Sequence, residues 1–166
     1  PSGASKIAVV YAEGPIVSGE VEGGLFGSSS GIADRTFRKW MDEIREDDTI
    51  DAVVLRVNSP GGSGLASDMM WRDIERVKAA GKPVVVSMGN YAASGGYYIA
   101  APAAWIVAQP STLTGSIGVF GGKITFNGTY EKLGMTQTSF LRGAEADLLS
   151  PTAPFTDNGR LVYQTF

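Results

Sequence analysis

The chain has 166 residues, of which 43% are hydrophobic and 19% are charged, and this composition fits one globular domain with a sizeable core. Its net charge of −3, with no cluster of basic residues, argues against a nucleic-acid-binding surface. The sequence contains no cysteine, which excludes disulfides and thiolate sites, and no apolar run of the roughly 20 residues that a membrane-spanning helix needs.

The first part of the chain alternates between strand and helix patterns. Residues 6–17 are β-branched and apolar around a Gly-Pro break, which predicts a strand, a turn and a short second strand. The Gly- and Ser-rich residues 18–31 predict a mobile loop. Apolar residues at helical spacing predict a helix over residues 32–45. Residues 51–57 form a short apolar run before turn residues, as expected of a buried parallel strand.

The same alternation continues further along the chain. Helical spacing predicts a second helix over residues 66–77, ended by the "AAGKP" segment. Residues 84–88 predict another buried strand, residues 94–103 a short helix and residues 105–110 a third buried strand. This order predicts an α/β layered fold, with a mostly parallel sheet and crossover helices.

Two glycine-bearing turns fall where consecutive strands are expected to end, in residues 58–63, "NSPGGS", and 89–96, "GNYAASGG". Ligand sites in parallel α/β folds lie at the carboxyl ends of the strands. Each turn also leads into a helix, whose first N–H groups have no partner within the helix. Two such groups facing one point would form an oxyanion hole. The plain alternative is that both are ordinary strand-to-helix turns, where glycine is common for steric reasons.

Three motifs together carry a family resemblance. They are "VNSPGGS" at 57–63, "MGNYAASGGYYIA" at 88–100 and "PSTLTGSIGV" at 110–119. Their order and spacing resemble those of the signal peptide peptidase A family of serine peptidases, which has the layered fold of the Clp protease and crotonase superfamily. The resemblance extends over residues 6–152, nearly the whole chain.

The resemblance assigns roles to four residues and implies no cofactor and no metal. It implies that Ser94 is the nucleophile and that the backbone amides of Gly95 and Gly62 form the oxyanion hole. Ser116 falls where the family has a hydroxyl close to the catalytic pair. For Ser116, a structural hydroxyl at the end of a strand is an equal alternative.

The proton acceptor is the missing part of this site. The chain contains no histidine, so a Ser-His-Asp arrangement within it is impossible and a Ser-Lys pair remains. A lysine acts as a base only when its pKa is lowered by desolvation or by a nearby positive charge. Short members of the family carry this lysine in a segment like "SGxxKDxxSP". The corresponding residues 142–151 read "RGAEADLLSP", with Ala146 in the position of the lysine.

Long members of the family offer a solution, because they consist of two tandem copies of the fold. In them the serine lies in the C-terminal copy and the lysine comes from the N-terminal copy, across a subunit boundary. We therefore expect residues 1–166 to be a single Clp/crotonase-like domain and a fragment of a longer tandem-repeat protein. Three alternatives stay open: an engineered replacement of lysine at Ala146, a pseudo-enzyme, or Lys123, close after "TGSIG", as a substitute base.

The resemblance also implies the substrate and the setting. The expected substrates are cleaved signal peptides and similar apolar peptides, paired with the strand-like residues 115–121, "GSIGVFG". The expected assembly is a homo-oligomer anchored to the bacterial inner membrane through a part outside these residues, with this domain soluble and on the periplasmic side. Tyr97, Tyr98 and Trp105 could line pockets, although aromatic residues in such elements belong more often to the core.

Two other classes of function remain in competition. A crotonase-like enzyme acting on acyl-coenzyme A would also use two backbone amides as an oxyanion hole, and it would need no serine nucleophile. A non-catalytic assembly module would explain the absent lysine.

Overall fold

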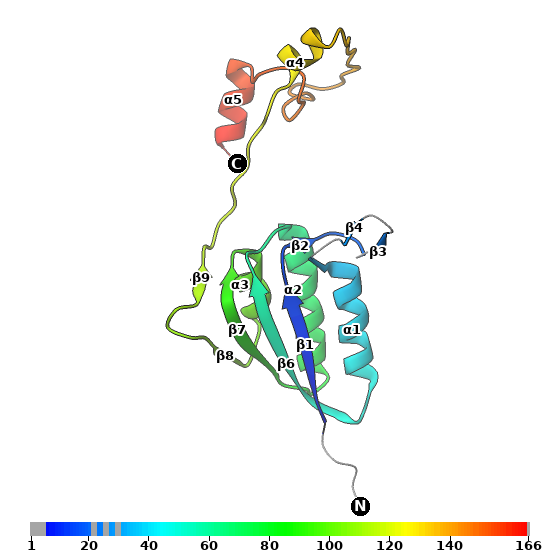
Figure 1. Cartoon of the computed structure of the whole chain (residues 1–166), viewed down its shortest axis with the longest axis vertical. Coiled ribbons are helices and arrows are strands. Elements are labelled where there is room, and N and C mark those ends of the chain that lie inside the picture. The colour runs from blue at the N-terminus through cyan, green and yellow to red at the C-terminus, as the bar shows by residue number, and fades with distance from the viewer. Residues whose placement is uncertain (1–5, 21–22, 25–26, 29–30, 166) are drawn as a thin grey trace, which may run out of the picture. The chain divides into compact units, whose positions relative to one another are not determined.

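A parallel sheet forms the centre of the first part of the molecule (Figure 1). The computed structural model describes residues 6–20, 23–24, 27–28 and 31–165. The sheet has five strands in the order β1-β6-β7-β8, with β9 paired to β7, and every pairing is parallel. The strands are β1 (Lys6–Glu13), β6 (Ile50–Ser59), β7 (Val84–Ala93), β8 (Trp105–Val107) and β9 (Leu113–Gly115).

Three helices connect these strands: α1 (Asp34–Glu46), α2 (Gly64–Ala79) and α3 (Gly95–Ala100). The predicted α/β layered fold, with its mostly parallel sheet and crossover helices, is confirmed. Helix α1 buries Phe37, Met41 and Ile44, and α2 buries Met70, Ile74 and Val77. These spacings of three and four residues place each set on one helix face, which packs on the buried side of the sheet.

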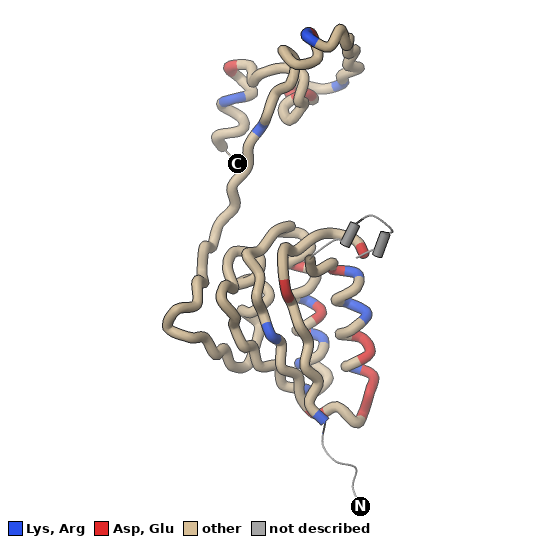
Figure 2. The backbone as a smooth tube through the Cα atoms, in the orientation of Figure 1, with Lys and Arg blue, Asp and Glu red and all other residues tan. Residues whose placement is uncertain are grey.

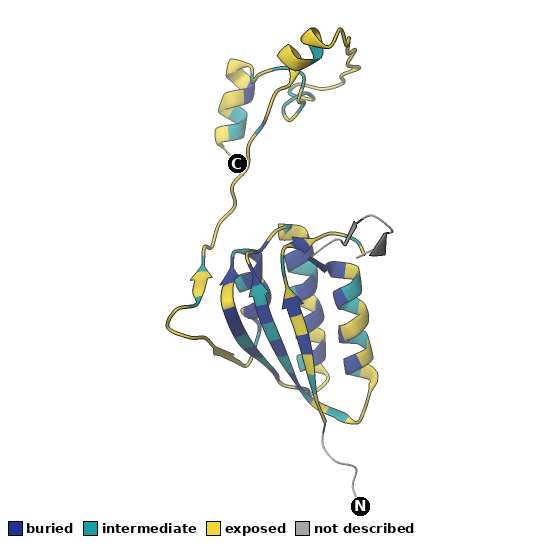
Figure 3. Ribbon diagram, in the orientation of Figure 1, coloured by how far each residue is buried: buried dark blue, intermediate teal, exposed yellow. Residues whose placement is uncertain are grey.

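Burial alternates along the central strands of the sheet (Figure 3). Along β6 every second residue from Val53 to Ser59 is buried, because those side chains point toward the helices. On the opposite face Ile7, Val9 and Tyr11 of β1 are 62%, 53% and 63% exposed. Trp105 of β8 is 75% exposed, so the preference for a core position is wrong for this aromatic residue.

The segment predicted as a mobile loop contains short strands in its described part. Strand β2 (Ile16–Val17), just before the segment, pairs in parallel with β5 (Ile32–Ala33), just after it. Strand β3 (Gly23–Gly24) pairs antiparallel with β4 (Gly27–Ser28). Residues 21–22, 25–26 and 29–30 of the predicted loop lie outside the described residues.

The chain divides into two compact units, Pro1–Val119 and Phe120–Phe166, and each is described by itself. The second unit contains α4 (Asn127–Lys132) and α5 (Asp157–Gln164). The prediction of a strand at residues 115–121 is wrong, because β9 ends at Gly115. Gly115 and Ser116 both have positive φ angles, 81° and 49°, which no regular strand can continue through.

None of the helices in the described residues combines the length and apolar character needed to cross a membrane.

Candidate active site

The two glycine turns lie in direct contact at the carboxyl edge of the sheet. A Cβ atom added to Gly61 would lie 2.6 Å from the Gly95 nitrogen and 2.9 Å from the Ser94 Cβ. A Cβ atom on Gly96 would lie 2.5 Å from the carbonyl oxygen of Ser59, the last residue of β6. Real Cβ atoms do not approach so closely, so both turns need glycine for their backbones to meet.

Ser94 occupies a sharp turn between β7 and α3. Its φ of 51° and ψ of −119° lie outside the regions that L-residues favour, so the surrounding structure must hold this conformation. One hydrogen bond that stabilises this conformation is donated by the Ser94 N–H to the Gly115 carbonyl at 2.8 Å. A strained strand-to-helix turn of this kind exposes a serine hydroxyl above the edge of a sheet.

Gly62 and Gly95 each offer a backbone N–H near Ser94. Gly95 is the first residue of α3, so its N–H has no acceptor one turn earlier in the helix. Around Gly62, the Ile16 N–H donates to the Gly61 carbonyl at 2.8 Å, and the Ser63 N–H donates to the Ile16 carbonyl at 2.9 Å. These bonds hold the Gly62 turn against β2, and in the part of the chain that the structure describes no hydrogen bond uses the Gly62 N–H.

A cavity of about 300 Å³ joins these groups. Its lining is uncharged and consists of Gly62, Gly64, Ser94, Gly95, Tyr97, Tyr98, Ala101, Ile117, Gly118 and Val119. Residues 83–122 contain no charged side chain at all, as the uninterrupted tan trace over this stretch shows (Figure 2). The cavity is therefore suited to apolar groups. Nowhere in the described residues do three or more His, Cys, Asp or Glu side chains gather as they would around a metal ion.

One wall of the cavity is fixed by a hydrogen bond between helices. The Tyr98 hydroxyl on α3 donates to Asp68 Oδ1 on α2 at 2.9 Å, and Arg72 Nε donates to Asp68 Oδ2 at 2.9 Å. The Tyr98 hydroxyl, followed by Arg72, lowers the pKa of Asp68, and the Asp68 carboxylate raises the pKa of Tyr98. Tyr98 thus stays a neutral phenol, 40% exposed, and its partner stays ionised.

Ser116 directly follows Gly115, whose carbonyl accepts the hydrogen bond from the Ser94 N–H. It is exposed and has a φ of 49°, and it does not line the cavity, although Ile117, the next residue, does. The role of Ser116 as an auxiliary hydroxyl stays a prediction.

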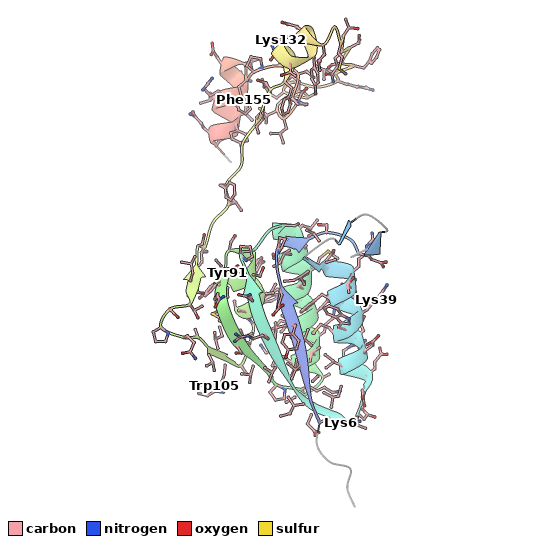
Figure 4. The ribbon with its side chains drawn as sticks, in the orientation of Figure 1. Lys6, Lys39, Tyr91, Trp105, Lys132 and Phe155 are labelled. Carbon is pink, nitrogen blue, oxygen red and sulfur yellow. The ribbon has the colours of Figure 1, made fainter. Side chains whose placement is uncertain are left out.

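The lysines of the first unit are all bonded elsewhere. Lys6 lies at the start of β1, at the opposite end of the sheet from Tyr91 (Figure 4). The Nζ atoms donate as follows: Lys6 to Thr49 Oγ1, Lys39 to Glu20, Lys78 to Glu75 and to the Pro102 carbonyl, and Lys82 to the carbonyls of Ile44 and Asp47. No lysine is among the described residues that line the cavity.

Lys123 is held inside the second unit. Its Nζ donates to the Leu148 carbonyl at 3.0 Å and lies 4.7 Å from the centroid of the Phe155 ring. These contacts give Lys123 a structural role there. Its use as a substitute base stays a prediction, as does the meaning of Ala146, which lies exposed in a turn of the same unit.

Sequence reasoning missed one polar residue beside the site. The Asn58 side chain accepts hydrogen bonds from the backbone of β7, and Ser94 directly follows this strand. The available signal was its type and place, a polar residue at the end of the buried run before "SPGG".

Comparison with known proteins identifies the family of the chain. The model of the peptidase family S49 matches residues 76–166, more than half of the chain. The chain belongs to peptidase family S49. The range matched to the S49 model includes Ser94, Gly95 and Ser116, whereas Gly62 precedes it.

Several relatives of the chain are proteases by name. The chain is 45% identical to Protease 4 of Salmonella typhi, over 86% of this chain and 22% of the relative. It is 40% identical to the chloroplastic serine protease SPPA of Arabidopsis thaliana, over 99% of this chain and 25% of the relative. The chain thus spans about a quarter of the length of these two relatives. Among solved structures, ClpP1 of Listeria monocytogenes is 20% identical over 63% of this chain and 52% of that chain, with a TM-score of 0.44.

Proposed function

We propose that this chain supplies the nucleophile and the oxyanion hole of a serine endopeptidase. The observation that carries the proposal is the direct contact between the Gly61-Gly62 turn and the Ser94-Gly95 turn, beside one uncharged cavity. Membership of peptidase family S49 supports it. A crotonase-like acyl-CoA enzyme would need the two amides without the strained serine, so the Ser94 conformation favours the peptidase.

The proposed reaction begins with attack of the Ser94 Oγ on a peptide carbonyl carbon. The Oγ–H proton passes to a neutral base, and the carbonyl oxygen becomes an oxyanion that accepts hydrogen bonds from the Gly62 and Gly95 amides. Collapse of this intermediate breaks the C–N bond, and the base returns the proton to the leaving amine. Water then hydrolyses the acyl-serine by the same route, with the base taking the proton of the water.

The base in this proposal is a lysine from outside the first unit, supplied by the N-terminal copy of the fold or by another subunit. Two observations support it: the uncharged residues 83–122 offer no base, and the lysines of the first unit are bonded away from the cavity. An apolar cavity favours the neutral form of a lysine placed beside it, since desolvation lowers its pKa.

The proposed substrates are extended apolar peptides, including cleaved signal peptides. Among the described strands β9 pairs only with β7, so its other edge is free to pair with a peptide backbone. Ile117 and Val119 follow that edge and line the uncharged cavity, which suits apolar side chains. A homo-oligomer at the bacterial inner membrane, with this domain on the periplasmic side, stays a prediction of the family resemblance.

Covalent labelling of Ser94 tests this proposal. We expect a serine-directed phosphonylating probe to modify the full-length protein at Ser94, and Ser94→Ala to abolish both labelling and peptide hydrolysis. The control is Ser111→Ala, because Ser111 is exposed and lies outside the cavity lining. An active full-length preparation that stays unmodified at Ser94 would refute the peptidase mechanism.

A further inference from the structure

Strand β7 contains a bulge just before the nucleophile turn. Val57 of β6 pairs with Met88 of β7, and the next pair is Ser59 with Ala92. Between these pairs β6 has only Asn58, whereas β7 has the three residues from Gly89 to Tyr91. The extra residues of β7 must leave the regular ladder, so their backbone groups need other partners.

The Asn58 side chain supplies the acceptor for this bulge. Its Oδ1 accepts the N–H of Asn90 at 3.1 Å and the N–H of Tyr91 at 3.4 Å. On the other side of the bulge, the Thr112 hydroxyl donates to the Gly89 carbonyl at 2.9 Å. Side chains thus replace the lost ladder bonds.

The fit between Asn58 and the bulge is close. A Cβ atom on Gly89 would lie 2.8 Å from Asn58 Oδ1 and 3.0 Å from its Cβ. The Asn58 carbonyl is also used, since the Gly14 N–H donates to it at 3.0 Å. Asn58 is therefore fixed through its main chain while its side chain holds β7.

The bulge decides where Ser94 lies along the sheet. Without the two additional residues of β7, Ser94 would move by about 6.6 Å relative to the Gly61-Gly62 turn, given a rise of about 3.3 Å per residue. Such a shift keeps every side chain on its own face of the sheet, so core packing alone would not oppose it. An oxyanion hole, in contrast, needs donors about 2.7–3.1 Å from the oxyanion.

We infer that Asn58 is a positioning residue for the peptidase reaction: its side-chain oxygen holds the β7 bulge that aligns Ser94 and Gly95 with Gly62. This inference rests on the proposed function. It assigns Asn58 no contact with substrate, since Asn58 does not line the cavity.

The test compares Asn58→Leu, which removes the acceptor, with Asn58→Asp, which keeps it. In the full-length protein we expect Asn58→Leu to lower kcat about 100-fold with little change in KM, because small displacements of reacting groups have effects of this size. Asn58→Asp should recover most of the loss. The matched control is Asn90→Ala, which changes a bulge side chain and leaves the two N–H donors intact, and its kcat should equal that of the parent.

Amide hydrogen exchange gives a readout that does not depend on activity. Asn58→Leu should speed exchange at the Asn90 and Tyr91 amides, and Asn58→Asp should not. If Asn58→Leu does not fold, Asn58→Ser replaces it, since its short hydroxyl cannot reach both amides.

The outcomes separate this inference from the proposed function. Parent-like kcat and exchange in Asn58→Leu would overturn the positioning role, and so would an Asn58→Asp variant as impaired as Asn58→Leu. If Ser94→Ala leaves hydrolysis intact, the proposed function fails, and the exchange result alone then decides whether Asn58 holds the bulge.

Discussion

Gly62 has no room for a side chain. A Cβ atom there would lie 2.1 Å from the Ile16 carbonyl oxygen and 2.8 Å from the Ile16 nitrogen, and the φ of Gly62 is 152°. Both Ile16 groups belong to backbone that is bonded to the same turn, so the turn would have to move away from β2. We expect Gly62→Ala to lower kcat about 100-fold or more, the cost of losing one oxyanion-hole donor. Steady-state peptide hydrolysis by the full-length protein measures this.

Gly64 provides the control for this change. It lines the same cavity, but a Cβ atom on it would meet nothing within 4 Å. Gly64→Ala should therefore retain kcat within a few-fold and fold normally. Equal activity of the two alanine variants would contradict a role for the Gly62 amide.

Residue types allowed the close approach of the two glycine turns to be predicted, but not the whole geometry of the candidate site. The meeting of the Gly61-Gly62 and Ser94-Gly95 turns could be predicted because turn chemistry limits which residues can stand where backbones approach closely. The catalytic roles of Ser94, Gly95 and Gly62 stay predictions. The type and place of Asn58 mark it as a polar residue near the site, but its hydrogen bonds to β7 could not be predicted, because they depend on an irregular register between β6 and β7 that no local pattern specifies. The hydrogen bond from the Ser94 N–H to the Gly115 carbonyl could not be predicted for the same reason, since the two residues meet through the pairing of β7 with β9.

A buried lysine from another segment, Lys82, donates hydrogen bonds at the C-terminal end of helix α1. The Lys82 side chain is only 8% exposed, and its Nζ donates to the carbonyls of Ile44 and Asp47 at 2.6 and 2.7 Å. These carbonyls lie at the C-terminus of the helix, where the dipole favours a cation. Lys82→Met would leave them without this donor, so we expect a loss of about 1–3 kcal/mol in the free energy of unfolding. Urea denaturation of the full-length protein measures it.

Lys39 is the comparison for this prediction. It also pairs with a partner, Glu20 at 3.0 Å, but the two side chains are 65% and 44% exposed. Exposed pairs contribute little, so Lys39→Met should change the free energy of unfolding by less than about 1 kcal/mol. Comparable losses in both variants would show that burial of Lys82 is not the cause.

Elements with a clear period were predictable, and those defined by irregular partners were not. The spacing of Phe37, Met41 and Ile44 located α1 to within a few residues. Strand β7 is longer than its apolar run, because residues 89–93 are held by Asn58, Thr112 and β9 rather than by burial of alternate side chains. The strand expected over residues 115–121 depended on composition alone, and the positive φ angles at its start prevent it.

At the scale of the whole molecule, the nucleophile and the base belong to different parts of the protein in our proposal. We expect residues 1–166 alone to remain unlabelled by the phosphonylating probe, because the chain lacks the base, while the full-length protein is labelled at Ser94. Mass spectrometry of the labelled peptide measures this. The control is Lys123→Ala in the full-length protein, which should label like the parent because Lys123 is occupied within the second unit. Labelling of residues 1–166 alone would place the base within the chain.

The fluorescence of Trp105 can report on the sheet face that lies opposite the helices. Trp105 is 75% exposed there, whereas Trp40, another of the three tryptophans, is 39% exposed. In water Trp105 should emit at long wavelength and be quenched readily by acrylamide. Any layer that packs on β8 would remove both properties, since burial transfers the indole to an apolar environment. Replacing Trp40 and Trp71 by phenylalanine would leave Trp105 as the single tryptophan of the chain, and its emission wavelength under selective excitation would report whether water reaches this face of the sheet.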